Sequence, residues 1–84
     1  MKPVRIYTTP YCPYCVRAKR LLDRKHVPYQ EIDVANDDEA RARLSEQTGM
    51  RTVPQIFIGD ECVGGSDDLH ALEAEGKLDT LLTG

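Results

Sequence analysis

The most constraining feature of this 84-residue chain is a pair of cysteines two residues apart, Cys12-Pro13-Tyr14-Cys15. The pair follows Val4-Arg5-Ile6-Tyr7, a short run of β-prone residues that Thr8-Thr9-Pro10 ends. Pro13 suits the first position of a helix, where its missing N–H group costs nothing. We therefore expect both cysteines at the junction between a strand and a helix.

The residues after this junction predict a β-α-β unit. In residues 13–25 the apolar positions fall on one helical face and the arginines on the opposite face: Cys15, Ala18, Leu21 and Leu22 against Arg17, Arg20 and Arg24. His26-Val27-Pro28 ends that helix, and residues 29–34 show the alternation of a second strand. Two strands joined through a helix are expected to be parallel.

After the second strand, the chain predicts another helix over residues 37–48. Asn36 begins a sequence that resembles a capping box, and Gly49 is able to end the helix in a left-handed conformation. Residues 55–63 then predict a tight antiparallel hairpin, because Gly59-Asp60 lies between two β-prone runs. This hairpin is expected to add two strands to the sheet.

The last part of the chain predicts one more helix and a packed end. Ser66 is expected to cap a helix that runs to about Glu75, and leucines at positions 78, 81 and 82 suggest a final packed turn. The resulting order, β-α-β-α-β-β-α, predicts an α/β fold with a four-stranded mixed sheet and three helices, in a single domain over residues 1–84. In that order, a Cys-x-x-Cys directly after the first strand is typical of thioredoxin-like redox chemistry.

The expected positions of the two cysteines give them different roles. Cys12 lies just before the helix, where unpaired backbone N–H groups and the positive end of the helix dipole favour a thiolate. Cys15 lies on the apolar face of the helix, so we expect it to be shielded and to act as the resolving thiol. A zinc site is the alternative, but Cys62, His26 and His70 are scattered without a second paired spacing, and no metal is expected.

Charge is distributed unevenly along the chain. The first 25 residues hold seven basic side chains and one acidic, whereas the remaining residues hold four basic and thirteen acidic. We therefore expect an anionic small ligand near the cysteine pair. Nucleic-acid binding is not expected, because the basic residues alternate with apolar ones at helical spacing. No apolar run approaches the roughly 18 residues of a membrane span and no signal peptide is recognisable, so a soluble, cytoplasmic protein is expected.

Two loops keep alternative roles when only their residues are considered. Pro54 is ordinary at the start of a strand, and a generic X-Pro bond is cis in only about 5–6% of cases. The run Gly64-Gly65-Ser66-Asp67-Asp68 forms either a simple capped turn or a helix N-terminus whose backbone N–H groups bind an anion. In the second case the Asp side chains are free for an ammonium group.

Three motifs in this order and spacing resemble those of glutaredoxins, specifically small bacterial dithiol glutaredoxins. They are Cys12-Pro13-Tyr14-Cys15, the run from Thr52 to Gly59, and the run from Gly64 to Leu69, and the resemblance covers essentially the whole chain. It implies a thioredoxin fold with a cis Val53-Pro54 peptide, and glutathione as the co-substrate of a monomeric enzyme. The glutathione contacts that it implies are Tyr14, Thr52, Val53, Pro54, Gly65, Ser66 and Asp67.

The sequence departs from the family pattern at two positions. Many glutaredoxins carry a Lys three residues before the first Cys, where this chain has Thr9. Arg51, or alternatively Arg41, is the candidate to bind the glycine carboxylate of glutathione instead, and the other interpretation is that both are solvated surface residues. At Ser66 some relatives have an extra Cys, and here Cys62 lies four residues earlier. We expect Cys62 to be a small strand residue, with a secondary redox or dimer-forming thiol as the alternative.

The resemblance and the residues together predict a glutathione-dependent thiol–disulfide oxidoreductase with Cys12 and Cys15 as the catalytic dithiol. The expected partners are glutathione and proteins that carry glutathionylated cysteines or disulfides, and ribonucleotide reductase is one candidate. One alternative is a glutaredoxin-like electron donor that thioredoxin reductase reduces. Another is an iron–sulfur scaffold or carrier, in which Cys12 of two chains and two glutathione molecules would ligate a cluster, although Pro13 argues against it by the family pattern.

Overall fold

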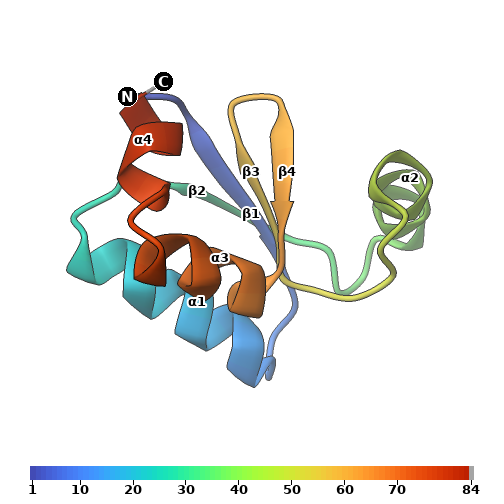
Figure 1. Cartoon of the computed structure of the whole chain (residues 1–84). Helices are drawn as coiled ribbons and strands as arrows, with labels where there is room; N and C mark the ends of the chain where they lie inside the picture. Colours follow the sequence, from blue (N-terminus) through green and yellow to red (C-terminus); the bar gives the residue numbers. More distant parts are fainter. Residues whose placement is uncertain (84) are drawn as a thin grey trace.

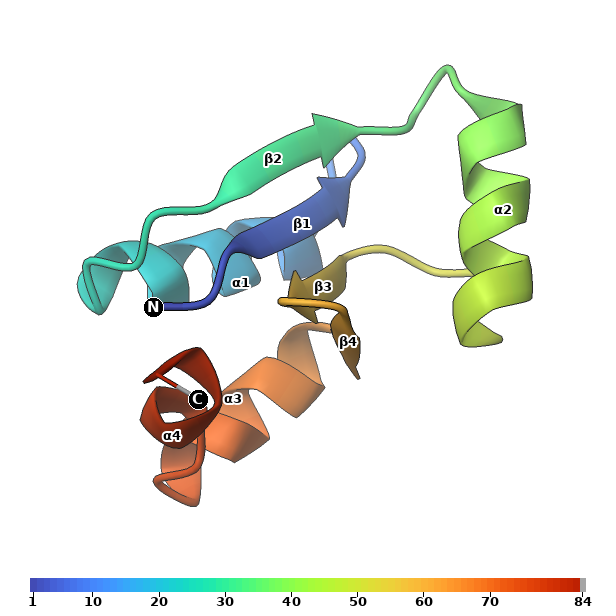
Figure 2. The same ribbon diagram turned by 90° about the horizontal axis from the view of Figure 1, so that it is seen from above.

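Strand β1 lies inside a four-stranded sheet with the order β2-β1-β3-β4. The computed structural model describes residues 1–83, and Figures 1 and 2 show the arrangement of its elements. β1 pairs with β2 in parallel and with β3 antiparallel, and β3 pairs with β4 antiparallel. The elements are β1 (Val4–Thr8), α1 (Pro13–Arg24), β2 (Gln30–Asp33), α2 (Asp38–Thr48), β3 (Gln55–Ile58), β4 (Glu61–Gly64), α3 (Ser66–Ala74) and α4 (Leu78–Thr83).

The two faces of the sheet contact different helices. Side chains of β1 and β3 pack on one face against α1, α3 and α4, and this cluster includes Ile6, Leu22, Ile56, Leu69 and Leu78. Phe57 points to the opposite face, as expected from strand alternation, and packs there with Leu44 of α2. Figure 2 shows α2 on the far side of the sheet from α1 and α3. The predicted α/β fold with a mixed sheet is thus confirmed.

The hairpin between β3 and β4 has the predicted two-residue turn. Gly59 adopts a φ of 62°, a left-handed conformation that glycine adopts without steric cost, and Ile58 pairs with Glu61 across the turn. Farther along, Ile56 pairs with Gly64 and Phe57 with Cys62, so β4 carries one additional residue opposite β3. This bulge bends β4 where the chain leaves the sheet for α3.

The start of α2 differs from the expectation. The N-cap is Asp37 and not Asn36: the Asp37 carboxylate accepts a hydrogen bond from the Ala40 N–H at 3.0 Å. Asn and Asp are equally good N-caps, so residue type does not decide between neighbours. Gly49 ends α2 as predicted, with a φ of 76°.

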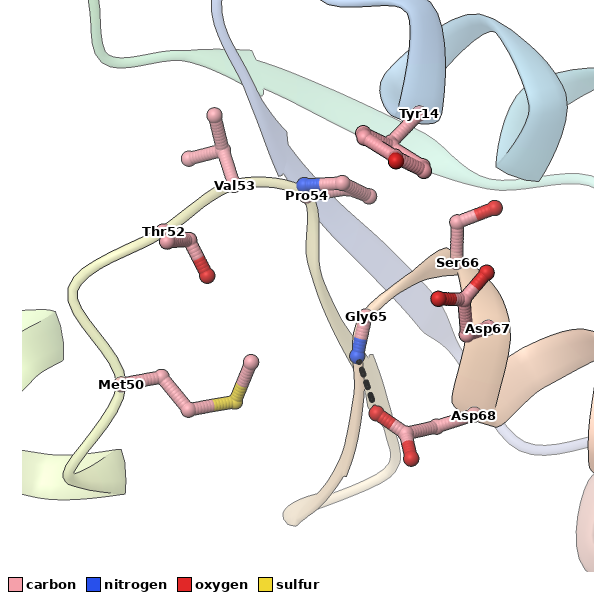
Figure 3. Close-up of a pocket in the computed structure, with 9 residues that line it drawn as sticks. All are labelled: Tyr14, Met50, Thr52, Val53, Pro54, Gly65, Ser66, Asp67 and Asp68. Atoms are coloured by element: carbon pink, nitrogen blue, oxygen red, sulfur yellow. Dashed lines mark hydrogen bonds between the residues drawn. The ribbon is translucent and has the colours of Figure 1, made fainter.

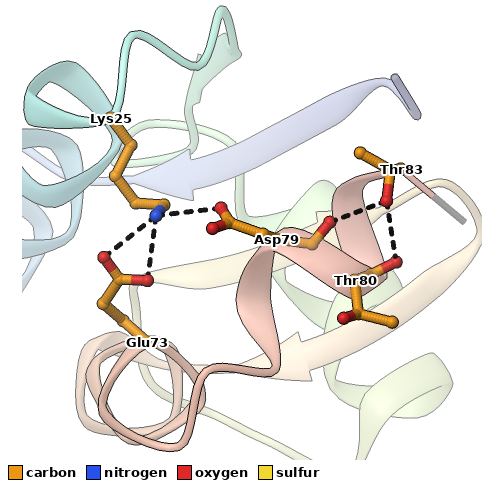
Figure 4. A network of polar contacts seen from close by, with 5 residues as sticks. All are labelled: Lys25, Glu73, Asp79, Thr80 and Thr83. Atoms are coloured by element: carbon orange, nitrogen blue, oxygen red, sulfur yellow. Dashed lines mark hydrogen bonds and ion pairs between the residues drawn. The ribbon is translucent and has the colours of Figure 1, made fainter.

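The C-terminal part of the described chain forms a short helix, α4, in place of the single packed turn that we expected. Leu78 and Leu82 are buried in the core, and the backbone N–H of Lys2 donates to the Leu82 carbonyl at 2.7 Å. Lys25, just after α1, pairs through Nζ with Glu73 of α3 and with Asp79 of α4, both at 2.9 Å (Figure 4). This lysine therefore holds three helices together.

None of the helices in residues 1–83 combines the length and the apolar composition needed to span a bilayer.

Candidate active site

Cys12 is the N-cap residue of α1, as predicted. Its Sγ accepts a hydrogen bond from the backbone N–H of Cys15 at 3.2 Å, and it contacts the carbonyl oxygen of Val53 at 3.7 Å. Pro13 occupies the first turn of the helix. The Cys15 N–H group would remain as a donor to a Cys12 thiolate, and the helix dipole also stabilises negative charge at this end. The position of Cys12 thus suits a nucleophilic thiolate.

Cys15 has a different environment although it is one helical turn away. The residue is only 1% exposed and packs into α1's buried side. Burial, together with the hydrogen bond to Cys12, raises the pKa of the Cys15 thiol to about 12, and a contact with the Thr9 backbone opposes this only in part. At neutral pH Cys15 is therefore a protonated, shielded thiol. Both thiols, and that of Cys62, are free in this structure.

A cleft of about 340 Å³ lies next to the cysteine pair (Figure 3). One wall is the segment before β3, where Val53 and Pro54 are joined by a cis peptide bond, as the resemblance implied. The other wall is the beginning of α3, and Tyr14 of α1 lies between the two walls at the edge. Its lining residues are Tyr14, Met50, Thr52, Val53, Pro54, Gly65, Ser66, Asp67 and Asp68.

The beginning of α3 differs by one residue from the prediction. Gly65 is the N-cap, whereas Ser66 is the first helical residue and is buried. The Asp68 carboxylate accepts a hydrogen bond from the Gly65 N–H at 2.9 Å, so this carboxylate closes the first turn. Asp67 is exposed and lines the cleft, and Figure 3 draws its carboxylate near Ser66 and Tyr14. The two adjacent aspartates therefore have different environments.

Two glycines precede α3. Gly64 has a φ of 109°, and a Cβ at this position would collide with the Asp68 carboxylate that binds the Gly65 N–H. At Gly65 a Cβ would lie 3.4 Å from the carbonyl oxygen of Pro54, on the opposite wall of the cleft. A side chain at Gly64 would therefore disturb the first turn of α3, both through its positive φ and through this collision, whereas a Cβ at Gly65 would make an ordinary contact with the opposite wall.

The structure brings together most of the residues that the sequence singled out. Seven of the predicted ligand contacts line the cleft, but Arg51 does not: it is exposed, next to Thr52 in the chain. Arg41 is also exposed, on α2. Met50 also lines the cleft, and no motif of the sequence indicated it. Asp68 lines the cleft too; the sequence placed it in the candidate run before α3 but not among the glutathione contacts. A clue to Asp68 was its place in the first turn of α3.

Residues 1–83 contain no group of three or more His, Cys, Asp or Glu side chains placed to hold a metal ion. Cys62 lies on β4, is half-buried and packs against the cluster that contains Phe57. This position agrees with the prediction that Cys62 is a small strand residue.

Comparison with known proteins identifies the relatives of this chain. The glutaredoxin family model matches residues 4–63. A glutaredoxin of Pseudomonas aeruginosa is 60% identical over 83 residues, which are 99% of each chain, and glutaredoxin 3 of Escherichia coli is 49% identical over 98% of this chain and 99% of its own. The crystal structure of a buckwheat glutaredoxin–glutathione complex superimposes with a TM-score of 0.93 and 38% identity, over 98% of this chain and 77% of that one.

The fold, the Cys12/Cys15 pair at the N-terminus of α1 and these matches all lead to one family. The chain belongs to the glutaredoxin family of thiol–disulfide oxidoreductases, with the thioredoxin fold.

Proposed function

We propose that this glutaredoxin uses glutathione to reduce protein–glutathione mixed disulfides and protein disulfides. The observation that carries the proposal is the cleft beside Cys12, because it combines a backbone edge, an acidic side chain and a helix N-terminus. A tripeptide with two carboxylates and one ammonium group needs these three features. The similarity to a solved glutaredoxin–glutathione complex supports the same ligand.

Each part of the ligand has a proposed contact in the cleft. The backbone of Val53, next to Pro54, would pair with the peptide of glutathione. The γ-glutamyl carboxylate would bind at the N-terminus of α3, beside Ser66, and the ammonium group would pair with Asp67. Asp68 would take no direct part, since its carboxylate already accepts the Gly65 N–H.

The remaining contacts lie at the edges of the cleft. Tyr14, about half exposed, would flank the tripeptide next to Cys12. Thr52 and Gly65 line the opposing walls. Arg51 would bind the glycine carboxylate only if its side chain turned toward the cleft, which its exposed position on the loop permits.

The chemistry proceeds by two thiol–disulfide exchanges. The Cys12 thiolate attacks the glutathionyl sulfur of the substrate, so a Cys12–glutathione disulfide forms and the protein thiolate leaves and takes up a proton. The thiolate of a second glutathione attacks the glutathionyl sulfur of that intermediate. Oxidised glutathione is released and Cys12 returns as a thiolate. The two electrons thus come from two glutathione molecules, and Cys15 is not needed.

Protein disulfides require the second cysteine. Cys12 forms a mixed disulfide with one sulfur of the substrate, and Cys15 then attacks Cys12, which releases the reduced substrate and leaves a Cys12–Cys15 disulfide. Glutathione reduces this disulfide in turn. Burial favours the protonated form of Cys15, so this thiol loses its proton as it attacks.

The test is turnover of a glutathionylated peptide with glutathione and glutathione reductase as the only source of electrons. We expect turnover by the wild type and by Cys15→Ser, and none by Cys12→Ser. Replacing Asp67→Ala is expected to reduce kcat/KM for glutathione about tenfold, through loss of a charge-assisted contact. The matched control is Asp60→Ala, on the exposed turn of the hairpin, with no change expected.

Two results would overturn the proposal. Loss of turnover in Cys15→Ser would contradict the division of labour between the cysteines. Absence of turnover in the wild type, with Cys12 still reactive to an alkylating reagent, would favour the alternative function, an electron donor that thioredoxin reductase reduces.

A further inference from the structure

A basic groove lies outside the cleft, between α1 and α3. Its volume is about 430 Å³, and its lining residues are Arg17, Arg20, Asp23 and Arg24 of α1 with His70 of α3. The three arginines are exposed, and none of them has an ion-pair partner within residues 1–83. Three guanidinium groups with one carboxylate among them leave the groove with excess positive charge.

The basic groove lies next to the cleft, because a lining residue of the groove contacts a lining residue of the cleft. Tyr14, Arg17, Arg20 and Arg24 follow one another at intervals of three or four residues, so they lie along one face of α1. The Arg17 guanidinium lies 5.6 Å from the centre of the Tyr14 ring, and Tyr14 lines the cleft. A substrate chain that runs from Cys12 past Tyr14 would therefore reach the groove.

The α3 side of the groove is also connected to the cleft. His70 Nδ1 donates to the carbonyl oxygen of Ser66 at 2.8 Å, which fixes the imidazole ring, and Ser66 lines the cleft. Each side of the groove thus contacts a residue that lines the cleft: Arg17 contacts Tyr14, and His70 binds Ser66.

The distance from the edge of the cleft at Tyr14 to the far end of the basic groove at Arg24 sets the length of the segment that could reach from one to the other. Arg24 lies ten positions after Tyr14, which corresponds to about 15 Å along a helix. An extended peptide advances about 3.3 Å per residue, so about five residues span this distance.

We propose that the basic groove binds acidic residues of a protein substrate that lie within about five residues of its reacting cysteine. This inference rests on the proposed function and names the class of protein substrate that the same site prefers. The distribution of charge supports this proposal. The whole chain has a net charge of −3, so an acidic segment is attracted to this protein only at a local cluster of basic side chains such as the groove. The partner is thus an acidic cysteine-bearing segment.

The test measures the attack of Cys12 directly and needs no glutathione. Three peptides carry one cysteine in disulfide linkage with a coloured aromatic thiol, and the flanking residues are acidic, neutral or basic. In Cys15→Ser protein the Cys12 thiolate attacks the peptide sulfur, a Cys12–peptide disulfide forms, and the aromatic thiolate leaves and is measured by its absorbance. The second-order rate constant is compared among the peptides at low and at high salt.

The decisive comparison uses two double variants with the same change in net charge. Arg20→Glu/Arg24→Glu alters the basic groove and leaves Tyr14 and Arg17 intact. Arg43→Glu/Lys77→Glu is the control, since both residues are exposed and lie outside the groove and the cleft.

We expect the parent protein to react with the acidic peptide about fivefold faster than with the basic one, despite its negative net charge, and we expect salt to reduce this preference. The groove variant should lose or reverse the preference, whereas the control should keep it. Equal rates for the three peptides, or equal losses in both double variants, would overturn the inference. Turnover of small glutathione disulfides is measured in parallel, so failure of the proposed glutathione dependence is detected separately.

Discussion

At the scale of single residues, the structure separates two cysteines that the motif alone makes equivalent. The sequence predicted this division, because a residue before a helix is accessible to solvent and a residue on its apolar face is not. Arg51 shows the limit of such reasoning. A motif places a residue in a loop, but the direction of a long exposed side chain depends on neighbours that the sequence does not identify.

The first prediction concerns the reactivity of Cys15. Its pKa of about 12 leaves a very small thiolate fraction at pH 8, and its side chain is buried. We expect iodoacetamide to modify Cys12 at least about a hundredfold faster than Cys15 in the native, reduced protein at pH 8. Mass spectrometry of proteolytic fragments, with protein unfolded in urea as the control in which Cys15 also reacts, measures both rates. Similar rates in the native protein would contradict the assignment.

At the scale of helices and strands, the sequence predicted the C-terminal ends of α2 and α3 more closely than their N-cap residues. The observed N-caps are Asp37 and Gly65, and each is adjacent to the residue that the sequence predicted. In both cases the two neighbouring residues are suitable N-caps. The direction from which the chain enters the helix selects between them, and this direction depends on tertiary packing. The C-terminal ends of α2 and α3 were predictable, because the glycine that follows each helix, Gly49 and Gly76, adopts a left-handed conformation.

The C-terminal ends of α1 and α3 share one hydrogen-bonding pattern but differ in residue type. After α1, His26 N–H binds the Asp23 carbonyl and Val27 N–H binds that of Leu22; after α3, Gly76 and Lys77 bind the carbonyls of Glu73 and Leu72 in the same way. This is a Schellman motif. His26 has a φ of 56° and Gly76 a φ of 73°, so the first motif places a non-glycine residue in a left-handed conformation.

The second prediction follows from this difference. His26→Gly is expected to stabilise the protein by about 0.5–1 kcal/mol, because relief of the left-handed backbone exceeds the entropy lost by a glycine on folding. The reverse exchange, Gly76→His, is expected to destabilise it by a similar amount. Urea unfolding of both variants measures the change in free energy, and a destabilised His26→Gly would show that the His26 side chain stabilises the fold in another way.

At the scale of the whole molecule, local patterns do not determine which elements meet. The sequence predicted parallel strands in the first half and a hairpin in the second, but it did not predict that β3 pairs with β1. That pairing joins residues about fifty positions apart, and it places α3 beside α1. The basic groove, which has a wall from each of these helices, was therefore not predictable from either helix alone.

The third prediction concerns the lysine that joins three helices. The carboxylates of Asp79 and Glu73 raise the pKa of Lys25 above its usual value of 10.5. Its contribution to stability is therefore complete below pH 10.5 and is lost as the pH rises through the higher pKa of the folded state. We expect Lys25→Met to lower the urea midpoint at neutral pH, and we expect the difference from wild type to shrink at higher pH. The control is Lys77→Met, which removes an exposed pair with Glu75 and should change little.

A midpoint difference that stays constant from neutral to strongly alkaline pH would show that Lys25 acts through packing of its carbon chain and not through its charge.

The hydrogen bond between Lys2 and Leu82 has a consequence for the connectivity of the chain. It holds the first described residues beside the last described ones, and Figure 1 shows α4 next to the start of β1. Cys12 follows the opposite end of the same strand. A circular permutant with a short linker between these ends, and new termini at the Gly59–Asp60 turn, would keep every wall of the cleft in place. We therefore expect the geometry of the site to be independent of the order in which its elements are connected along the chain.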